Sequence, residues 1–391
     1  MDRKTALLSE RDPELDSFDS AVRAAAFERI AGEIENGTLI PDQAEHRHNM
    51  HCHTFYSYNP MHWSPSHLAV TAKLLGFTHI GKVEFDVLNG LDEFFRACGR
   101  LGLKCVCGME TRVFIPEMAE HELNSPGEKG VAYHLGIGFR NESLTGKAKT
   151  FAADLAARAG KRTRTVVTLV NDALKDLRID FDKDLLPLTP AGNPTERHAC
   201  AAYRQKAAQL FGADALDFWG AKLSLSDAER VSAAKSDVAL EGLIRSRLMK
   251  NGGPGCVKAD SSSFPALAEM NAFIDECGAV PSYAWLNGFS SGEADPEKLL
   301  SFHLARGMRV LTIIPDRNWN IGDPVKRAAA IRKLDEVMEA ARSLALPVVA
   351  GTELNSPGCK LFDDFTKDPL KAHYDAFYAG AEFVCSFKAS R

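Results

Sequence analysis

Two histidines separated by one residue, His51 and His53, are the side chains of this sequence best placed to do chemistry. Residues two apart in a β-strand project from the same side, so both imidazoles would point in one direction. At the end of a strand such a pair can supply two nitrogen ligands to one metal ion. His46 and His48 would point to the opposite face. Taken by itself, His-x-His is also typical of a hydrogen-bonded or solvent-facing pair.

Later apolar runs also end in residues that could ligate a metal. These residues are Glu84, Glu110, His134, Glu353 and Asn355. Solvation at the end of a strand explains any one of them, because a charged side chain avoids burial without a partner. If the strands form one barrel, however, all of these ends meet at one rim. Together with the histidine pair they would hold a divalent ion such as manganese, iron or zinc.

The elements that must position these residues alternate along the chain. Short apolar runs predict strands at 47–54, 77–85, 104–114, 133–139, 280–286, 310–315 and 347–353. Apolar residues at helical spacing predict helices at 65–76, 91–101, 262–277, 295–306, 325–344 and 369–380. Regular alternation of strand and helix indicates parallel βα units, and seven strands favour a barrel.

The order of these patterns divides the chain into four parts. Residues 1–45 predict a helical N-terminal extension, 46–140 the first part of the barrel and 253–391 its second part. Residues 141–252 interrupt the alternation with helical patterns at 147–159, 165–177, 198–211 and 227–249. An insertion that follows a barrel strand lies over the catalytic end, so we expect a lid over the active site.

Composition excludes several classes of protein. The 391 residues are 45% hydrophobic and 25% charged, which is enough for a barrel with additions. The net charge of −5, without a basic stripe, argues against nucleic acid as the main partner. The sequence lacks an apolar run long enough to cross a membrane. Nine irregularly spaced cysteines predict reduced thiols and a cytoplasmic location. The oligomeric state stays open.

The motifs around the candidate ligands resemble those of the PHP superfamily, the polymerase and histidinol phosphatase group of metal-dependent phosphoesterases. The family's H-x-H-[ST]-x-x-S-D-G is similar to residues 51–59, its T-D-H-D to 83–86 and its G-x-E to 108–110. Its A-H-P is similar to 284–286 and its G-S-D-x-H to 351–355. An R-P-H-[IF]-A element of one subfamily is similar to Arg197-His198-Ala199. The resemblance covers about 46–140 and 256–360, and it implies a distorted (β/α)7 TIM-like barrel of the PHP type with a helical insertion.

The resemblance also implies three metal sites, of which one keeps all its ligand types. Its ligands would be His51, His53, Glu110 and Glu353. The second site keeps Glu110 and His134, but Trp285 replaces its third ligand. In the third site Tyr58 and Phe85 replace ligands, and only Asn355 is left. We therefore expect one divalent ion per chain, and a second only if Glu84 rebuilds part of the cluster.

Hydrolysis of a small-molecule phosphate ester by metal-activated water is the activity that the resemblance implies. Glu84 or Asp86 would orient the attacking water as a general base. Arg197 and His198 of the insertion, and Arg317, would neutralise the negative charge of the phosphoryl oxygens. Trp285 is expected to contact the substrate. Two alternatives remain open because of the replaced ligands. One is a single-metal barrel enzyme with another reaction, such as amide hydrolysis, and the other is a metal- or ligand-binding pseudoenzyme.

Overall fold

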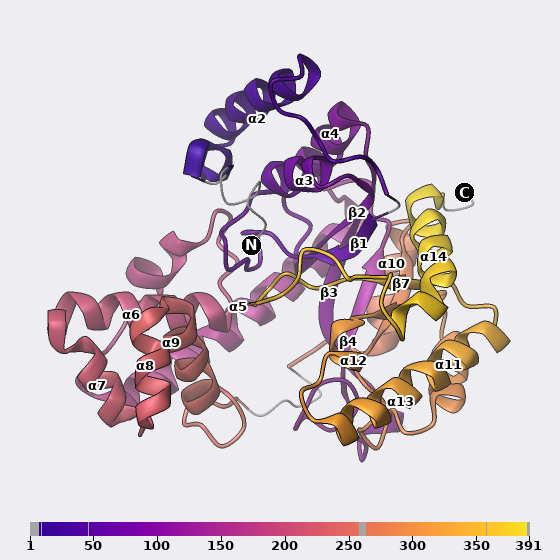
Figure 1. Cartoon of the computed structure of the whole chain (residues 1–391). Helices are drawn as coiled ribbons and strands as arrows, with labels where there is room; N and C mark the ends of the chain where they lie inside the picture. Colours follow the sequence, from indigo (N-terminus) through magenta and orange to yellow (C-terminus); the bar gives the residue numbers. More distant parts are fainter. Residues whose placement is uncertain (1–7, 9, 46, 258–262, 357, 389–391) are drawn as a thin grey trace.

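Seven strands form a nearly closed barrel at the centre of the molecule (Figure 1). The computed structural model describes residues 8, 10–45, 47–257, 263–356 and 358–388. The strands are β1 (Arg47–Cys52), β2 (Phe77–Phe85), β3 (Lys104–Phe114), β4 (Val131–Ile137), β5 (Val280–Trp285), β6 (Val310–Ile313) and β7 (Val348–Ala350), and they pair in this order. The outer edges meet where Cys52 bridges Glu353 and the His53 N–H donates to the Glu353 carbonyl over 2.8 Å.

The predicted seven-stranded barrel is therefore confirmed, but the expectation of an all-parallel sheet is wrong. Strand β4 runs antiparallel to both of its neighbours, β3 and β5. Parallel neighbours need a crossover, usually a helix, whereas the chain between β3 and β4 forms only turns and the short 3-10 helix η2 (Pro116–Met118). The C-terminal end of β4 therefore lies at the end of the barrel opposite to the other strands' C-terminal ends.

Small and branched apolar side chains fill the barrel interior. Each of the seven strands contributes to them. They form one buried cluster that includes Val83, Val106, Leu135, Val280 and Val349. Helix α14 (Tyr374–Ser386) lies against β7 and adds Ala381 and Val384 to this cluster. A Cβ at Gly380 would stand 1.9 Å from the carbonyl oxygen of Val348. Glycine is needed there because the helix backbone touches the strand backbone.

Helices cover the outside of the barrel. They are α3 (Pro65–Leu74), α4 (Leu91–Leu101), α10 (Leu267–Glu276), α11 (Pro296–Leu304), α12 (Asp316–Trp319) and α13 (Pro324–Ser343), with η7 (Leu370–His373) before α14. The N-terminal η1 (Pro13–Asp16) and α2 (Ser20–Glu35) pack on α3. Phe27 and Ile30 of α2 belong to the same core cluster as the barrel helices. The N-terminal extension is thus packed on the barrel.

The segment between β4 and α10 forms a helical lobe beside the barrel (Figure 1). Its elements are α5 (Gly146–Leu174), η3 (Phe181–Leu185), η4 (Leu186–Leu188), α6 (Glu196–Phe211), η5 (Gly212–Asp214), α7 (Ala215–Lys222), α8 (Asp227–Lys235), α9 (Asp237–Ile244) and η6 (Arg245–Met249). The lobe has its own apolar core, which includes Val167, Tyr203 and Trp219.

Helix α5 joins the lobe to the barrel. The sequence predicted two helices here, but the structure has one helix of 29 residues, which spans about 43 Å. Leu155 in its first half belongs to the barrel core, whereas Val167 and Val170 in its second half belong to the lobe core. Because β4 is antiparallel, the lobe does not follow a strand end at the rim as expected. It reaches the rim because α5 is long.

Candidate metal centre

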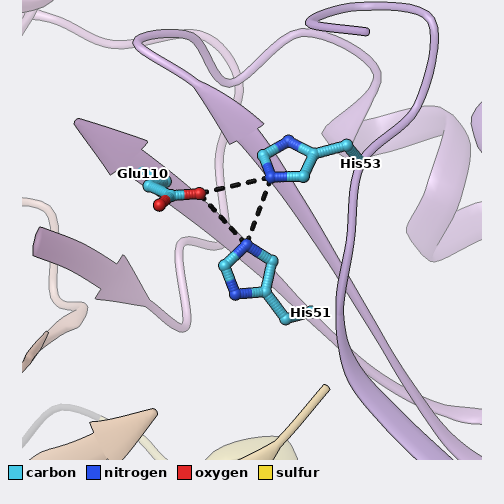
Figure 2. Close-up of side chains that lie close together, drawn as sticks. All are labelled: His51, His53 and Glu110. Carbon is cyan, nitrogen blue, oxygen red and sulfur yellow. Dashed lines mark hydrogen bonds and ion pairs between the residues drawn. The ribbon is translucent and has the colours of Figure 1, made fainter. Parts of the chain in front are cut away.

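Three ligand atoms meet at the rim of the barrel: Nε2 of His51, Nε2 of His53 and Oε2 of Glu110 (Figure 2). The two imidazole nitrogens are 3.2 Å apart, and they lie 3.1 and 3.2 Å from the carboxylate oxygen. His51 is on β1, His53 follows its last residue, and Glu110 is on β3. All three side chains are buried. Among the described residues this is the one group of three or more such side chains close enough to share an ion.

The seam between β1 and β7 brings the chain close behind His51. A Cβ at Gly351 would stand 2.4 Å from Cβ of His51 and 2.5 Å from its amide nitrogen. Glycine at 351 therefore allows the end of β7 to press against β1 at the point where the histidine pair begins. A side chain at position 351 would therefore overlap the backbone of His51.

The three donors fit a divalent cation by type and by spacing. Imidazole nitrogen and carboxylate oxygen suit zinc, iron and manganese. With bonds of about 2.1 Å, ligand atoms around one ion stand about 3.0 Å apart at right angles and about 3.4 Å at tetrahedral angles. The observed separations lie within this range. Burial would raise the pKa of Glu110, but its interactions with the imidazoles of His51 and His53 outweigh burial and hold the pKa well below its usual value.

The ring of His53 contacts Ser57 through a ring nitrogen and Phe85 through a ring face. Its Nδ1 lies 3.0 Å from Oγ of Ser57, and the ring of Phe85 stacks on it with centroids 4.1 Å apart. The resemblance of residues 83–86 implies that Phe85 replaces a ligand of a third ion, and in the structure an apolar ring fills that position. His48 stacks on Phe365 with ring centroids 4.6 Å apart. The register of β1 against β2 shifts between Asn49 and Cys52, so the strict alternation from which its opposite face was predicted does not hold along this strand. His46 lies outside the described residues.

The sequence prediction placed Glu84 at the rim, and the structure contradicts this. Glu84 is fully buried on the side of β2 away from the pocket. Its oxygens accept from Thr54 and Ser57, and the ammonium of Lys82 lies 3.2 Å away. The reason is the two-residue period of the strand, which turns Glu84 away from the face used by Val83 and Phe85. Glu84 cannot orient a water in the pocket from this position.

The placement of His134 at the rim is wrong for the same kind of reason. His134 pairs with Thr111 in the antiparallel ladder, whereas Leu135 pairs with Glu110 and shares its face. The His134 ring therefore points out of the barrel, where Nε2 lies 2.7 Å from Oδ1 of Asn271 on α10. Burial lowers the pKa of His134 to about 4. It is a buried neutral histidine of the helix layer.

Glu353 and Asn355 face the pocket but do not join the three donors. Oε2 of Glu353 lies 2.5 Å from Nη2 of Arg317 and accepts from the Asn355 side-chain amide over 2.9 Å. The backbone of Glu353 has a positive φ of 63°, and Leu354 follows with 54°. The strand predicted at 347–353 ends at Ala350, so residues 351–355 form a turn. In this turn the carboxylate of Glu353 pairs with Arg317.

Asp86 lies on the pocket wall as predicted for a base. Its positive φ of 60° turns the side chain at the end of β2, and its Oδ1 accepts from the hydroxyl of Thr111. Burial raises the pKa of Asp86, although the charge of Arg162 opposes the shift. A half-buried carboxylate with a raised pKa beside the three donors is suited to accept a proton.

A pocket of about 950 Å³ opens between the rim and the helical lobe. His51, Glu110, Asp86 and Trp285 line it from the barrel side, although Trp285 is only 1% exposed. Seven basic and five acidic side chains contribute to the lining. The basic residues are Arg112, Lys129, Arg162, Arg197, Arg245, Lys250 and Arg317.

Some of these cations are neutralised within the pocket and some are not. Arg112 pairs with Glu128 at 2.7 Å, and Lys250 pairs with Glu196 at 2.7 Å. Burial would raise the pKa of Glu196, but Lys250 and Arg245 lower it to about 2. Over the described residues, Arg162 and Arg197 make ring contacts but no ion pair. The lobe thus presents two guanidinium groups to the pocket that form no ion pair within 4 Å in the described chain.

Arg197 and His198, predicted to bind phosphate, lie in different surroundings. Arg197 lines the pocket, and its guanidinium lies 5.4 Å from the centroid of the Tyr58 ring. His198 is buried at the start of α6, where Nδ1 lies 3.1 Å from the hydroxyl of Thr195, and burial lowers its pKa to about 3. His198 is outside the pocket lining. The prediction that it contacts substrate is therefore wrong, because its ring caps the helix.

Sequence reasoning missed several residues of the site. Arg112 follows Glu110 by two positions in one strand, so strand periodicity alone could have placed it on the same face. Arg162 gave no such signal, since its position depends on α5 being one helix that passes the rim. Ser57 was given no role in the sequence analysis, although it lies four residues after His53 and contacts its ring.

The barrel and the three donors define the class of protein, an α/β barrel with a candidate metal centre at its rim. Residues 49–210 match the model of the PHP domain family. This match confirms the resemblance to the PHP superfamily. The matched residues include His51, His53 and Glu110 and end within the helical lobe.

Two solved structures are similar in fold. One is a proposed metal-dependent phosphoesterase from Bifidobacterium adolescentis, with 19% identity, a TM-score of 0.51 and coverage of 83% of this chain and 94% of that chain. The other is an amidohydrolase from Chromobacterium violaceum with bound sulfate and no metal, with 14% identity, a TM-score of 0.56 and coverage of 85% and 96%. No curated protein matches the chain. At these identities the likeness concerns the fold.

Proposed function

We propose that this chain is a metal-dependent hydrolase that acts on a small phosphate ester. The observation that carries the proposal is the position of the three donors. His51, His53 and Glu110 bring their ligand atoms within 3.2 Å of one another beside a pocket of about 950 Å³. The lining of this pocket has more basic than acidic side chains, which supports an anionic substrate.

A divalent ion at this centre would supply an acidified water near neutral pH. Asp86 is the pocket carboxylate that we assign to orient the nucleophile and accept its proton, because Glu84 faces away. Arg197 and Arg162 are assigned to the phosphoryl oxygens, since both line the pocket and neither forms an ion pair within 4 Å in the described chain. Guanidinium groups match phosphate geometry and remain charged at all working pH values.

We propose one ion per chain, manganese, zinc or iron. The positions at which the family binds further ions hold Trp285, Phe85 and Tyr58. Phe85 is stacked on His53, and the Tyr58 hydroxyl lies 3.4 Å from a carboxylate oxygen of Glu241 in the lobe. Arginine side chains would then provide the positive charge that additional ions provide elsewhere in the family.

The surroundings of the protein are also part of the proposal. All nine cysteines are free, which supports a reducing compartment such as the cytoplasm. In the described part of the chain, no helix combines the length and apolar character that crossing a bilayer requires. The substrate we expect is a small phosphorylated molecule that fits the pocket.

The proposal is tested by assaying the purified chain on a panel of phosphomonoesters and on a matched panel of amides, each with added Mn²⁺, Zn²⁺ or Fe²⁺. We expect metal-dependent release of inorganic phosphate that is lost in His53→Ala. Turnover of amides alone would replace the phosphoesterase by a single-metal amidohydrolase. Metal binding without turnover of either panel would contradict the enzyme and favour a binding protein.

A further inference from the structure

The centre contains a buried chain of hydrogen bonds that ends on one of its ligands. The chain runs from the carboxylate of Glu84 through the hydroxyl of Ser57 to Nδ1 of His53. The distances are 2.5 Å from Ser57 Oγ to Glu84 Oε2 and 3.0 Å from Ser57 Oγ to His53 Nδ1. All three side chains are at most 1% exposed.

Glu84 can act only as an acceptor in this chain. Its Oε1 receives the hydroxyl of Thr54 and lies 3.2 Å from the ammonium of Lys82. Its Oε2 receives the backbone N–H of Thr54 over 3.3 Å as well as the Ser57 hydroxyl. These four donors occupy the acceptor positions of the buried carboxylate, so both of its oxygens accept.

The direction of every hydrogen bond then follows from the number of hydrogens. Ser57 has one hydroxyl hydrogen, and Glu84 takes it over the shorter distance. Its oxygen must therefore accept from His53, so Nδ1 of His53 carries the ring hydrogen and Nε2 carries a lone pair. That lone pair faces Oε2 of Glu110 at 3.2 Å, where two electron-rich atoms meet in a buried site. Such a contact is unfavourable unless a positive ion or a proton lies between the atoms.

We propose that Ser57 and Glu84 are positioning residues that fix His53 in the tautomer whose Nε2 can bind a metal ion. They act through His53 and do not touch the pocket, which neither of them lines. His51 lacks an equivalent hydrogen-bonded partner, since its Nδ1 has none among the described residues. The inference rests on the metal centre of the proposed function and is independent of the substrate.

The first test is a measurement on the unaltered chain. Long-range ¹H–¹⁵N NMR of metal-free protein with labelled histidines distinguishes the two neutral tautomers. We expect the His53 signal, assigned with His53→Gln, to show hydrogen on Nδ1. Hydrogen on Nε2 of neutral His53 would overturn the proposal, whether or not the chain hydrolyses any phosphate ester.

The second test is the dissociation constant of Zn²⁺ and Mn²⁺ measured by calorimetry. Ser57→Ala should bind both ions tenfold to a hundredfold more weakly, as is usual when a partner of a ligating histidine is removed. The control is Ser282→Ala, which removes a buried hydroxyl bonded to Thr312 at 2.8 Å without reaching His53. Equal affinity of Ser57→Ala and the unaltered chain would contradict the proposal. If Ser57→Ala does not fold, the NMR result decides alone.

Discussion

At the residue scale, the centre brings three polar side chains together in a buried place. His51 and His53 offer Nε2 atoms 3.2 Å apart, and Glu110 offers an oxygen to both. Burial of such groups costs free energy unless charge and hydrogen bonds are balanced. Two imidazoles and one carboxylate are balanced when a cation lies between them. The arrangement is therefore one in which metal binding would also stabilise the folded chain.

Asp86 is the side chain whose replacement should separate chemistry from metal binding. We expect Asp86→Asn to lower kcat by a factor of about 10² to 10⁴, the usual contribution of a general base, with little change in metal content. Because burial raises the pKa of Asp86 above 3.8, activity should fall as the pH drops through that raised value. Steady-state kinetics from pH 4 to 9 check this, and an unchanged kcat in Asp86→Asn would exclude the residue as the base.

Arg162 should affect binding more than folding. Its guanidinium lines the pocket, 5.0 Å from the ring centroid of Phe264, and forms no ion pair within 4 Å in the described chain. We expect Arg162→Gln to raise the inhibition constant of inorganic phosphate about tenfold, because a charge-assisted hydrogen bond is lost. The control is Lys129→Gln, since Lys129 is 63% exposed at the edge of the pocket. Equal effects of the two changes would mean that only overall charge attracts the anion.

At the element scale, α5 and α14 each contain a glycine, and replacing the two glycines should change the free energy of unfolding in opposite directions. Gly160 lies inside α5 with no atom within 4 Å of a Cβ, whereas a Cβ at Gly380 of α14 would overlap the backbone of β7. Gly160→Ala should increase the free energy of unfolding by about 0.5–1 kcal/mol, because alanine favours the helix. Gly380→Ala should decrease it. Urea denaturation measures both, and a destabilising Gly160→Ala would contradict the open surroundings of that position.

Sequence periodicity predicted elements well where the local pattern decides the structure. Strand β2 begins and ends at 77 and 85, and β3 at 104 and 114, as the apolar runs indicated. The direction of β4 could not be predicted in this way, because it depends on how the chain returns after β3. Because the direction of β4 was not predicted, the prediction that His134 lies at the rim was wrong, and so was the predicted path of the chain into the lobe.

The candidate site was predictable in part for the same physical reason. His51, His53 and Glu110 are brought together as the strand ends implied. The prediction for Glu84 was wrong because it rested on the charge of the residue. Alternate residues of β2 face opposite sides, and Phe85, not Glu84, faces the pocket. The pairing of Glu353 with Arg317 depends on a turn with positive φ that no local pattern announced.

At the scale of the whole molecule, the barrel supplies the donors and the lobe supplies positive charge. Arg162 of α5 and Arg197 of α6 reach the same pocket as Glu110 of β3. The lobe has a separate apolar core, yet α5 belongs to both cores. In the proposed function, the barrel would therefore bind the metal ion and the lobe would make most contacts with the substrate.

Buried histidines should make the stability of the whole molecule depend on pH. Burial lowers the pKa of His134 to about 4, from 6.5, and that of His303 well below 6.5. Below pH 6.5 the unfolded chain binds protons that the folded chain does not, so stability is complete above this pH and is lost as the pH falls toward 4. For His134 this costs roughly 2 kcal/mol at pH 5.

Removal of His134 tests this pH dependence. His134→Gln keeps a polar partner for Asn271 but cannot be protonated, so its free energy of unfolding should change less between pH 7 and pH 5 than that of the unaltered chain. Urea denaturation in the presence of a chelator measures the difference. Identical pH dependence of the two proteins would show that His134 is not held neutral by burial.

The most direct test of the account is the metal content of the purified chain after saturation with Zn²⁺ or Mn²⁺, measured by elemental analysis. We predict one ion per chain in the unaltered protein and in His134→Gln, whose ring faces the helix layer, and none in His51→Ala. Retention of the ion in His51→Ala, or its loss in His134→Gln, would contradict a metal centre built from His51, His53 and Glu110.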